Sequence, residues 1–192
     1  MYTNLLKVSD MWQIEVSRNY AIDMLMSMYL LPSRCLELAA KFSLYEWVEP
    51  AVTEIFEKPL GSLSAADIEC IGIKAYAIMV RGEECMEREI FCTANIEPVL
   101  ATDPSWKCEK HKVCIAVWCQ AWWDKIGRNL LHPDHPIKMK DILAEEKKMA
   151  TKDMDERCHK DVLRGMEANI VFVDKRVIAG VAASIVAYYN TL

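Results

Sequence analysis

The stretch Leu31–Leu60 reads LPSRCLELAAKFSLYEWVEPAVTEIFEKPL and predicts a tight pair of helices. Pro32 suits the first turn of a helix, because its ring fixes φ and the amide hydrogen that it lacks would be unpaired there. Apolar residues then recur at helical spacing and give one buried stripe, with Leu38 at its margin. The stripe consists of Cys35, Leu36, Ala39 and Phe42.

The second helix of the pair has an equally clear apolar face. Its members are Val48, Ala51, Val52, Ile55 and Phe56. Pro50 must lie in the first turn, because a proline deeper in a helix loses a hydrogen bond and clashes with the carbonyl four residues earlier. The helix therefore begins near Tyr45 to Trp47, and Pro59 ends it. We expect the Trp47 ring to be buried where the two helices meet.

The composition of the whole chain also favours an all-α protein. Its 192 residues suffice for one domain, or for two small helical lobes that share an interface. Hydrophobic residues make up 53% and charged residues 27%, which excludes a disordered chain. Only 6 glycines and 7 prolines are present, whereas an all-β protein needs a turn every ~8–12 residues. We expect an irregular bundle of about eight or nine helices, arranged as stacked helical pairs.

Charge and hydropathy argue against two classes of partner. The net charge of −5, without a concentrated Lys/Arg face, argues against nucleic acid, because such binding depends on neutralising phosphates. The opening MYTNLLKVSD lacks the apolar run of a signal peptide. The apolar segment Val177–Tyr189 is shorter than the ~20 residues that span a bilayer. We therefore expect an intracellular protein, nuclear or cytoplasmic, that binds neither nucleic acid nor membrane.

Apolar spacing and turn residues predict the other helices. Their expected ranges are 2–12, 15–28, 65–71, 73–91, 108–131, 137–149, 153–169 and 177–189. Ser64 and Asp67 have the spacing of a capping box, and Gly72 separates two helices. In the last helix, small residues are expected to let a neighbouring helix approach closely. They are Ala179, Gly180, Ala183 and Ser184.

The best boundary within the chain is the stretch Thr93–Ser105, because it contains Pro98 and Pro104. Residues 1–92 are expected to form a first helical region. Residues 93–192 are expected to form a second helical lobe that packs on the first, or continues it as one domain.

Two groups of soft or aromatic side chains have both a binding and a structural interpretation. Met24, Met26 and Met28 suit an adaptable binding surface, but we favour core filling. The tryptophans near residue 120 suit a ligand cage or an interface, but we favour a tryptophan-rich core seam. These tryptophans are Trp118, Trp122 and Trp123.

Cysteine and histidine recur in one pattern that indicates a metal, Cys108-x-x-His111-x-x-Cys114-x-x-x-x-Cys119. On a continuous helix the first three side chains follow an i, i+3 ridge, and zinc prefers thiolate and imidazole ligands. The candidates for a further ligand are Cys92, Cys158 and His159. Structural zinc sites usually have paired Cys-x-x-Cys knuckles, so we favour buried thiols and one surface histidine. His132 and His135 are placed to ligate a metal or to accept a proton, but no thiol partner is adjacent in sequence, so we favour a plain turn.

A series of short motifs runs through the first half of the chain. In order they are Leu5-Leu6-Lys7-Val8-Ser9-Asp10-Met11-Trp12, Arg18-Asn19-Tyr20-Ala21-Ile22, Pro32, Leu36-Glu37-Leu38-Ala39, Trp47-Val48-Glu49-Pro50-Ala51 and Ile71-Gly72. Their order and spacing resemble the region that follows the BTB (POZ) fold in BTB-domain proteins of basidiomycete fungi. The second half, with its Cys, Trp and Leu-Leu-His-Pro pattern, is similar to the C-terminal region of that family more loosely.

The resemblance implies a helical interaction module, BACK-like in residues 1–92, for which no enzymatic activity is known. The α/β BTB core, which precedes such a region and mediates dimerisation or cullin contact in the family, is not matched here, so those roles do not carry over. Standard motifs such as GxxxxGK, GxGxxG, HExxH and GxSxG are missing from the sequence.

We therefore expect a non-catalytic protein-interaction module that binds an unidentified protein partner. The interaction or structural residues expected from the sequence are Trp12, Trp47, Pro50, Trp118 and Trp122. The alternative is an α-helical zinc-binding protein or a small-molecule enzyme centred on Cys108–Trp123. Zinc, under this alternative, is the one cofactor that the sequence indicates.

Overall fold

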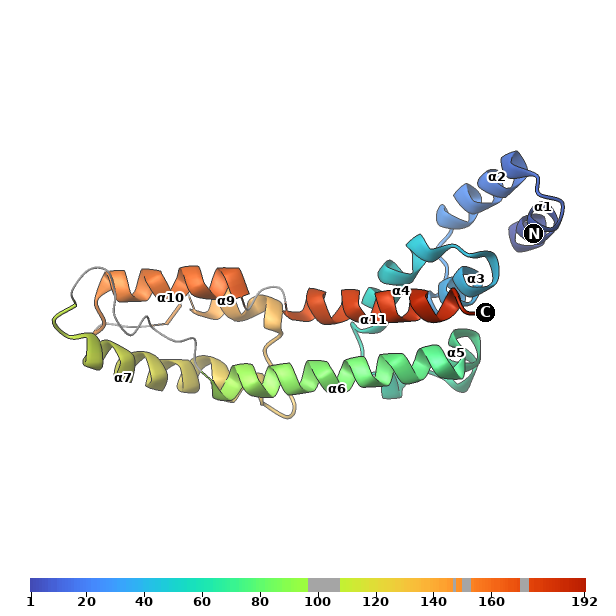
Figure 1. Ribbon diagram of the computed structural model, residues 1–192. Helices are drawn as coiled ribbons and strands as arrows, with labels where there is room; N and C mark the ends of the chain where they lie inside the picture. The colour runs from blue at the N-terminus through green and yellow to red at the C-terminus, as the bar shows by residue number, and fades with distance from the viewer. Residues whose placement is uncertain (97–107, 147, 150–152, 170–172) are drawn as a thin grey trace. The chain divides into compact units, whose positions relative to one another are not determined.

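The computed structural model describes residues 1–96, 108–146, 148–149, 153–169 and 173–192 (Figure 1). Every regular element within these ranges is helical, so the predicted all-α class is confirmed. The α-helices are α1 (Tyr2–Met11), α2 (Glu15–Met26), α3 (Pro32–Phe42), α4 (Val48–Ile55), α5 (Ala65–Ile71), α6 (Ile73–Asn95), α7 (His111–Trp122), α8 (Arg128–Leu130), α9 (Ile142–Glu146), α10 (Glu156–Asn169) and α11 (Val173–Tyr189). Three 3-10 turns and one π-helical turn join them: η1 (Tyr45–Trp47), η2 (Leu60–Ser62), η4 (Met139–Asp141) and the π-helical η3 (Trp123–Gly127).

The chain divides into two compact units. Unit 1 consists of residues 1–83 and 178–192, and unit 2 consists of residues 84–177. Of the boundary stretch expected from the sequence, residues 93–95 belong to α6, and residues 97–105, with Pro98 and Pro104, lie outside the described residues. That the second lobe packs on the first stays a prediction. Among the described residues, no helix combines the length and the apolar character that crossing a bilayer requires.

Unit 1 is built around the predicted helix pair. Pro32 occupies the first turn of α3, and that helix ends at Ser43 in the left-handed conformation. The turn η1 and then α4 follow, so that Pro50 lies in the first turn of α4, as predicted. α3 contacts α4 and also α5. Leu38, which we placed at the margin of the stripe, is buried with Leu36, Ala39 and Phe42, whereas Cys35, which we placed in the stripe, is only half-buried.

The cap of α5 has the geometry that the sequence predicts. The Asp67 N–H donates to Ser64 Oγ over 3.2 Å, and the Ser64 N–H donates to Asp67 Oδ2 over 3.1 Å. Ser33 Oγ also donates to Asp67 Oδ1 over 2.7 Å, which ties α5 to α3. The hydrogen bonds from Ser64 and Ser33 lower the pKa of Asp67. Gly72 ends the helix with φ of 83°, a conformation that favours glycine.

The expected close approach at α11 occurs, but on a different face. The small residues Ala179, Gly180, Ala183 and Ser184 are exposed, so the prediction that they form the contact face is wrong. The buried face of α11 in unit 1 consists of Val181, Ala182, Ile185 and Tyr189. The small residue at the contact is Gly82 of α6, where an added Cβ would lie 2.3 Å from Val181 Cγ2.

The core of unit 2 contains two of the three tryptophans of the seam that the sequence favoured, whereas the third, Trp123, is exposed, so its place in the core was predicted wrongly. Trp118 and Trp122 are each 1% exposed, and their ring centroids lie 5.7 Å apart. Ile126 and Leu130 continue the buried face beyond them. In a regular α-helix, side chains four residues apart point in gradually different directions, because one turn contains 3.6 residues. A π-helical turn contains more residues than an α-helical turn and so compensates for this rotation. The turn η3 therefore helps to keep this series on one side of the helix.

Gly127, in η3, lies against the backbone of α6, and we expect its replacement by alanine to destabilise unit 2. An added Cβ would lie 2.4 Å from the carbonyl oxygen of Ala94, so the backbone must move. The expected loss in free energy of unfolding is about 1–3 kcal/mol. Urea-dependent hydrogen exchange of α10 peptides measures it. Gly165→Ala is the control, because a Cβ there meets nothing within 4 Å and alanine should stabilise α10 by about 0.5–1 kcal/mol. Equal effects of the two substitutions would contradict this packing.

Candidate functional site

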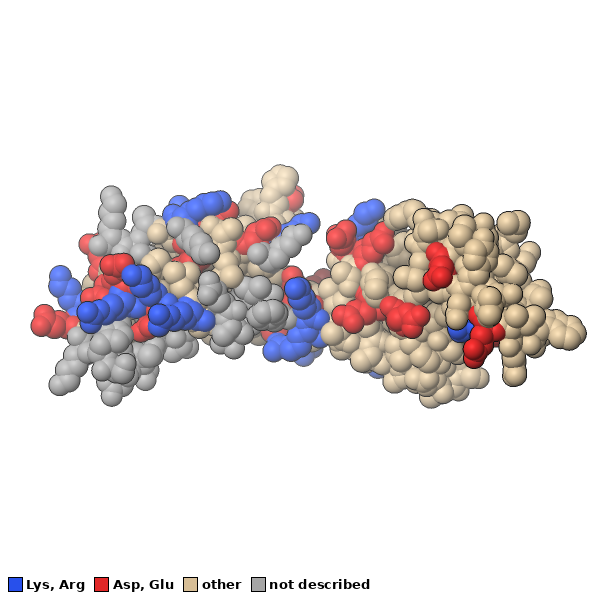
Figure 2. All heavy atoms as spheres, turned by 90° about the horizontal axis from the view of Figure 1, so that it is seen from above, with Lys and Arg blue, Asp and Glu red and all other residues tan. Residues whose placement is uncertain are grey.

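Large apolar side chains are exposed along α1, α2 and the segment that follows α2. They are Val8, Met11, Trp12, Ile14, Val16, Tyr20, Met26, Met28, Tyr29 and Leu31. Single exposed apolar residues are ordinary, but a concentration of them marks binding surfaces in many proteins. On the face drawn in Figure 2, unit 1 presents mostly uncharged surface, broken by separate Asp and Glu side chains.

Part of this surface is a groove of about 550 Å³ between the end of α2 and α4, which we call the α2–α4 groove. Its lining consists of Leu25, Met26, Ser27, Met28, Tyr29, Leu30, Pro32, Cys35, Glu46, Trp47, Pro50, Ala51 and Glu54. Met26 is 65% exposed and Met28 is 50% exposed, so the expectation that both fill the core is wrong. Two flexible thioethers instead border the groove, where they can adapt to a bound surface.

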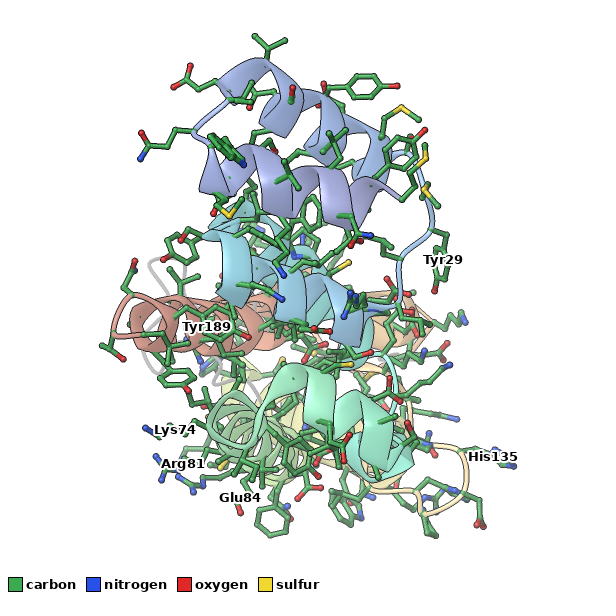
Figure 3. The ribbon with its side chains drawn as sticks, turned by 90° about the vertical axis from the view of Figure 1, so that its right-hand side faces the viewer. Tyr29, Lys74, Arg81, Glu84, His135 and Tyr189 are labelled. Atoms are coloured by element: carbon green, nitrogen blue, oxygen red, sulfur yellow. The ribbon has the colours of Figure 1, made fainter. Side chains whose placement is uncertain are left out.

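The charged side chains that line the α2–α4 groove are both acidic. Tyr29 lies on the segment between α2 and α3 (Figure 3), and its hydroxyl donates to Glu54 Oε1 over 2.7 Å. That hydrogen bond, together with the charge of Glu54, raises the pKa of Tyr29. Glu46 adds a second carboxylate. The groove therefore combines an apolar floor with negative charge.

The interaction residues predicted from the sequence have different positions in unit 1. Trp47 and Pro50 line the α2–α4 groove, with the Trp47 side chain largely buried and Pro50 exposed. Trp12 is exposed at the end of α1, outside the groove lining. Trp118 and Trp122 are buried in unit 2, where Trp122 Nε1 donates to the Thr93 carbonyl over 3.2 Å.

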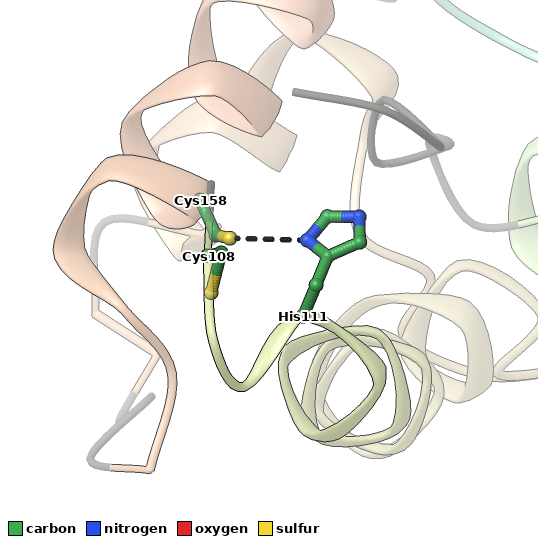
Figure 4. Close-up of side chains that lie close together, drawn as sticks. All are labelled: Cys108, His111 and Cys158. Atoms are coloured by element: carbon green, nitrogen blue, oxygen red, sulfur yellow. Dashed lines mark hydrogen bonds between the residues drawn. The ribbon is translucent and has the colours of Figure 1, made fainter. Parts of the chain in front are cut away.

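A second candidate site is a cluster of thiols and an imidazole in unit 2. The ligand atoms of Cys108, His111 and Cys158 all lie within 4.8 Å of one another (Figure 4). The Cys158 Sγ to His111 Nδ1 distance is 3.5 Å. Cys114 adjoins the group, with its Sγ 3.8 Å from Cys108 Sγ. Burial, and then the nearby thiols of Cys108 and Cys114, raise the pKa of Cys158.

The adjacent His159 does not belong to this group. Its Nε2 lies 2.7 Å from Oε1 of Glu146, a fully buried carboxylate at the end of α9. The His159 ring also lies 6.5 Å from the Trp118 ring, measured between centroids. His159 thus connects α10 with α9 and with the tryptophan seam, while Cys158 faces the thiol cluster.

The sequence identified part of this cluster correctly. Cys108 precedes α7 instead of lying within it, because α7 begins at His111. Cys119 is on α7 but is not among the residues grouped around His111, so its assignment as a ligand is not supported. Cys92 is exposed on α6. The residue that we proposed as one of several extra ligands, Cys158, is the one that α10 brings into the group.

The other two histidines form the turn that the sequence favoured. The rings of His132 and His135 are stacked with centroids 6.0 Å apart. The His135 N–H donates to His132 Nδ1 over 3.1 Å, so this nitrogen closes the turn.

The chain matches no protein-family model, and no curated protein or solved structure is significantly similar to it.

Proposed function

We propose that the chain is a non-catalytic, BACK-like protein-interaction module that binds a partner protein in the α2–α4 groove. The observation that carries the proposal is the concentration of exposed apolar side chains at the end of α2 and beside it, Met26, Met28 and Tyr29 among them. The resemblance of the first half of the chain to the region after a BTB fold supports the same function. None of the eight cysteines, all of which are among the described residues, forms a disulfide, which suits a reducing compartment inside the cell.

The chemistry of the groove indicates the kind of partner. An apolar floor with adaptable methionines suits the apolar face of an amphipathic segment. Glu46 and Glu54 would face the polar edge of such a segment, where a Lys or Arg side chain complements their charge. We therefore propose an amphipathic segment with at least one basic residue, supplied by another protein.

Met26→Glu tests the groove directly, because it places a charge on the apolar floor. Met26 is an exposed residue of α2, so folding should change little while binding weakens by at least about tenfold. The full chain is immobilised, proteins are captured from an extract of the native source, and the captured proteins are then made recombinantly and titrated. Ile73→Glu is the matched control, since Ile73 is 81% exposed and lies outside the groove.

The expected result is a partner that binds the unaltered chain and the Ile73→Glu variant but not the Met26→Glu variant. Glu46→Lys should also weaken binding, and it should reduce the dependence of affinity on salt. Equal binding by all variants would contradict the proposal. Sedimentation separates a further case: a dimer of the chain that Met26→Glu abolishes would make a second copy the occupant and overturn the proposed partner.

A further inference from the structure

We propose that Cys108, His111, Cys114 and Cys158 hold one structural zinc ion in unit 2. This site is separate from the α2–α4 groove and does not depend on the proposed interaction function. Three thiolates and one imidazole bind zinc in preference to harder divalent metals. The tetrahedral Cys₃His combination recurs in structural zinc sites.

Two distances between the ligand atoms match the edges of a zinc tetrahedron. With Zn–S near 2.3 Å and Zn–N near 2.0–2.1 Å, the edges of such a site are about 3.8 Å between two sulfurs and about 3.5 Å between sulfur and nitrogen. The Cys108 Sγ to Cys114 Sγ distance is 3.8 Å. The Cys158 Sγ to His111 Nδ1 distance is 3.5 Å. The ligand atoms of Cys108, His111 and Cys158 lie within 4.8 Å of one another, and Cys114, which is outside that group, would move toward them from beside Cys108 to complete the site.

The local structure explains why the three ligands from residues 108–114 converge. Cys108 lies in a turn before α7, and the His111 N–H donates to its carbonyl over 3.3 Å. This turn folds Cys108 back toward the first turn of α7, which carries His111 and Cys114. The first turn of a helix presents unpaired N–H groups and a partial positive charge, both of which stabilise thiolates.

The fourth ligand, Cys158, comes from α10, and the residue that caps the start of this helix fixes its position. Asp155 precedes α10, and its Oδ1 accepts a hydrogen bond from the Arg157 N–H over 2.8 Å. The Asp155 N–H donates to Cys114 Sγ over 3.3 Å. Such hydrogen bonds to a ligating sulfur orient it and stabilise its charge. Asp155 therefore positions Cys158 in the first turn of α10 while it contacts a ligand on α7.

The burial of the four ligands is typical of a structural zinc site and not of a catalytic one. Cys114 and Cys158 are buried, and Cys108 and His111 are half-buried. Four protein ligands leave no coordination position for water or a substrate, which distinguishes closed structural zinc sites from catalytic ones. The ion would join α7 to α10, and its ligands His111 and Cys158 lie 47 residues apart in the sequence.

Metal analysis of the full chain tests the proposal. The chain, purified without a histidine tag from zinc-supplemented cells under reducing conditions, should contain about one zinc ion per molecule. Cys158→Ser and Cys114→Ser should lose most of this zinc. Cys119→Ser is the matched control, since Cys119 lies on the same helix as Cys114 and belongs to the sequence pattern but is not one of the four proposed ligands. It should retain the full zinc content.

A second measurement uses the unaltered chain, so that a variant that fails to fold does not decide the result. Alkylation followed by peptide mapping should show Cys108, Cys114 and Cys158 protected by zinc and reactive after chelation. Cys92, exposed on α6, should react in both states. Chelation should also reduce the helical signal and the hydrogen-exchange protection of α10, because metal binding is coupled to folding.

Three outcomes would overturn the site. They are a chain without stoichiometric zinc under these conditions, loss of zinc from Cys119→Ser with retention in Cys158→Ser, and alkylation of the three cysteines that does not respond to chelation. None of these outcomes would alter the binding tests on Met26→Glu and Ile73→Glu, so the two proposals fail independently.

Discussion

Trp118→Ala is expected to lower the free energy of unfolding of unit 2 by about 3–5 kcal/mol. The ring is 1% exposed and packs on Trp122, so its removal leaves a cavity that the remaining core fills only in part. His159, whose ring lies next to Trp118, also loses a neighbour. The loss therefore extends from α7 to α10.

Urea-dependent hydrogen exchange, followed on peptides of α10, reports this loss for unit 2 alone. Trp123→Ala is the matched control, because Trp123 comes directly after α7, at the start of η3, but is 43% exposed. Its removal should change the free energy of unfolding by less than about 1 kcal/mol. Similar losses for the two variants would mean that the tryptophan seam is not the core of unit 2.

Trp47→Ala should have an effect of the same size on unit 1. Trp47 is 7% exposed in η1, between α3 and α4, and we expect its removal to lower the free energy of unfolding by about 3–5 kcal/mol. Its indole nitrogen is buried and has no acceptor among the described residues, so the loss comes from packing and not from a hydrogen bond. Exchange of α3 peptides measures it.

The control for Trp47 is Trp12→Ala, because Trp12 is 68% exposed at the end of α1. This variant should leave the exchange of α3 peptides nearly unchanged. A loss below about 1 kcal/mol for Trp47→Ala would contradict the tight helix pair. Trp47 also lines the α2–α4 groove, so Trp47→Ala is not suited to testing partner binding.

Helix ends were predictable wherever a local group determines them. The start of α3 was predictable because the fit of Pro32 to a first turn depends only on its own backbone. The start of α5 was predictable because Ser64 and Asp67, three residues apart, form its cap. Gly72 separates α5 from α6 for the same kind of reason, since its φ is positive. Each of these helix ends depends on residues that are close in sequence, so it could be predicted, and the structure confirms all three predictions.

The thiol cluster was predictable only in part, because one of its members depends on tertiary packing. Cys108, His111 and Cys114 are close in sequence and were identified from their spacing. Cys158 joins them only through the packing of α10. Cys119, the last residue of the sequence pattern, lies outside the group around His111, because five residues on from Cys114 correspond to about 140° around an α-helix.

The methionines of α2 show a different limit of sequence reasoning. Ala21, Ile22 and Leu25 follow helical spacing, and all three are buried. Continued spacing would place Met28 on the same face, but α2 ends at Met26 and the chain beyond it leaves the helical path. The end of the helix therefore explains why Met28 is exposed, whereas Met26 lies within α2 and off its buried face.

The two segments of unit 1 have a consequence for the order of folding during synthesis. At about 5–20 residues per second, on the order of ten seconds separate the appearance of residue 83 from that of residue 178. During this interval, in which unit 2 is synthesised, Gly82 has no Val181 to pack against it. The nascent chain therefore carries an incomplete first unit while the second unit becomes available to fold, which is the period when a chaperone has most reason to bind it.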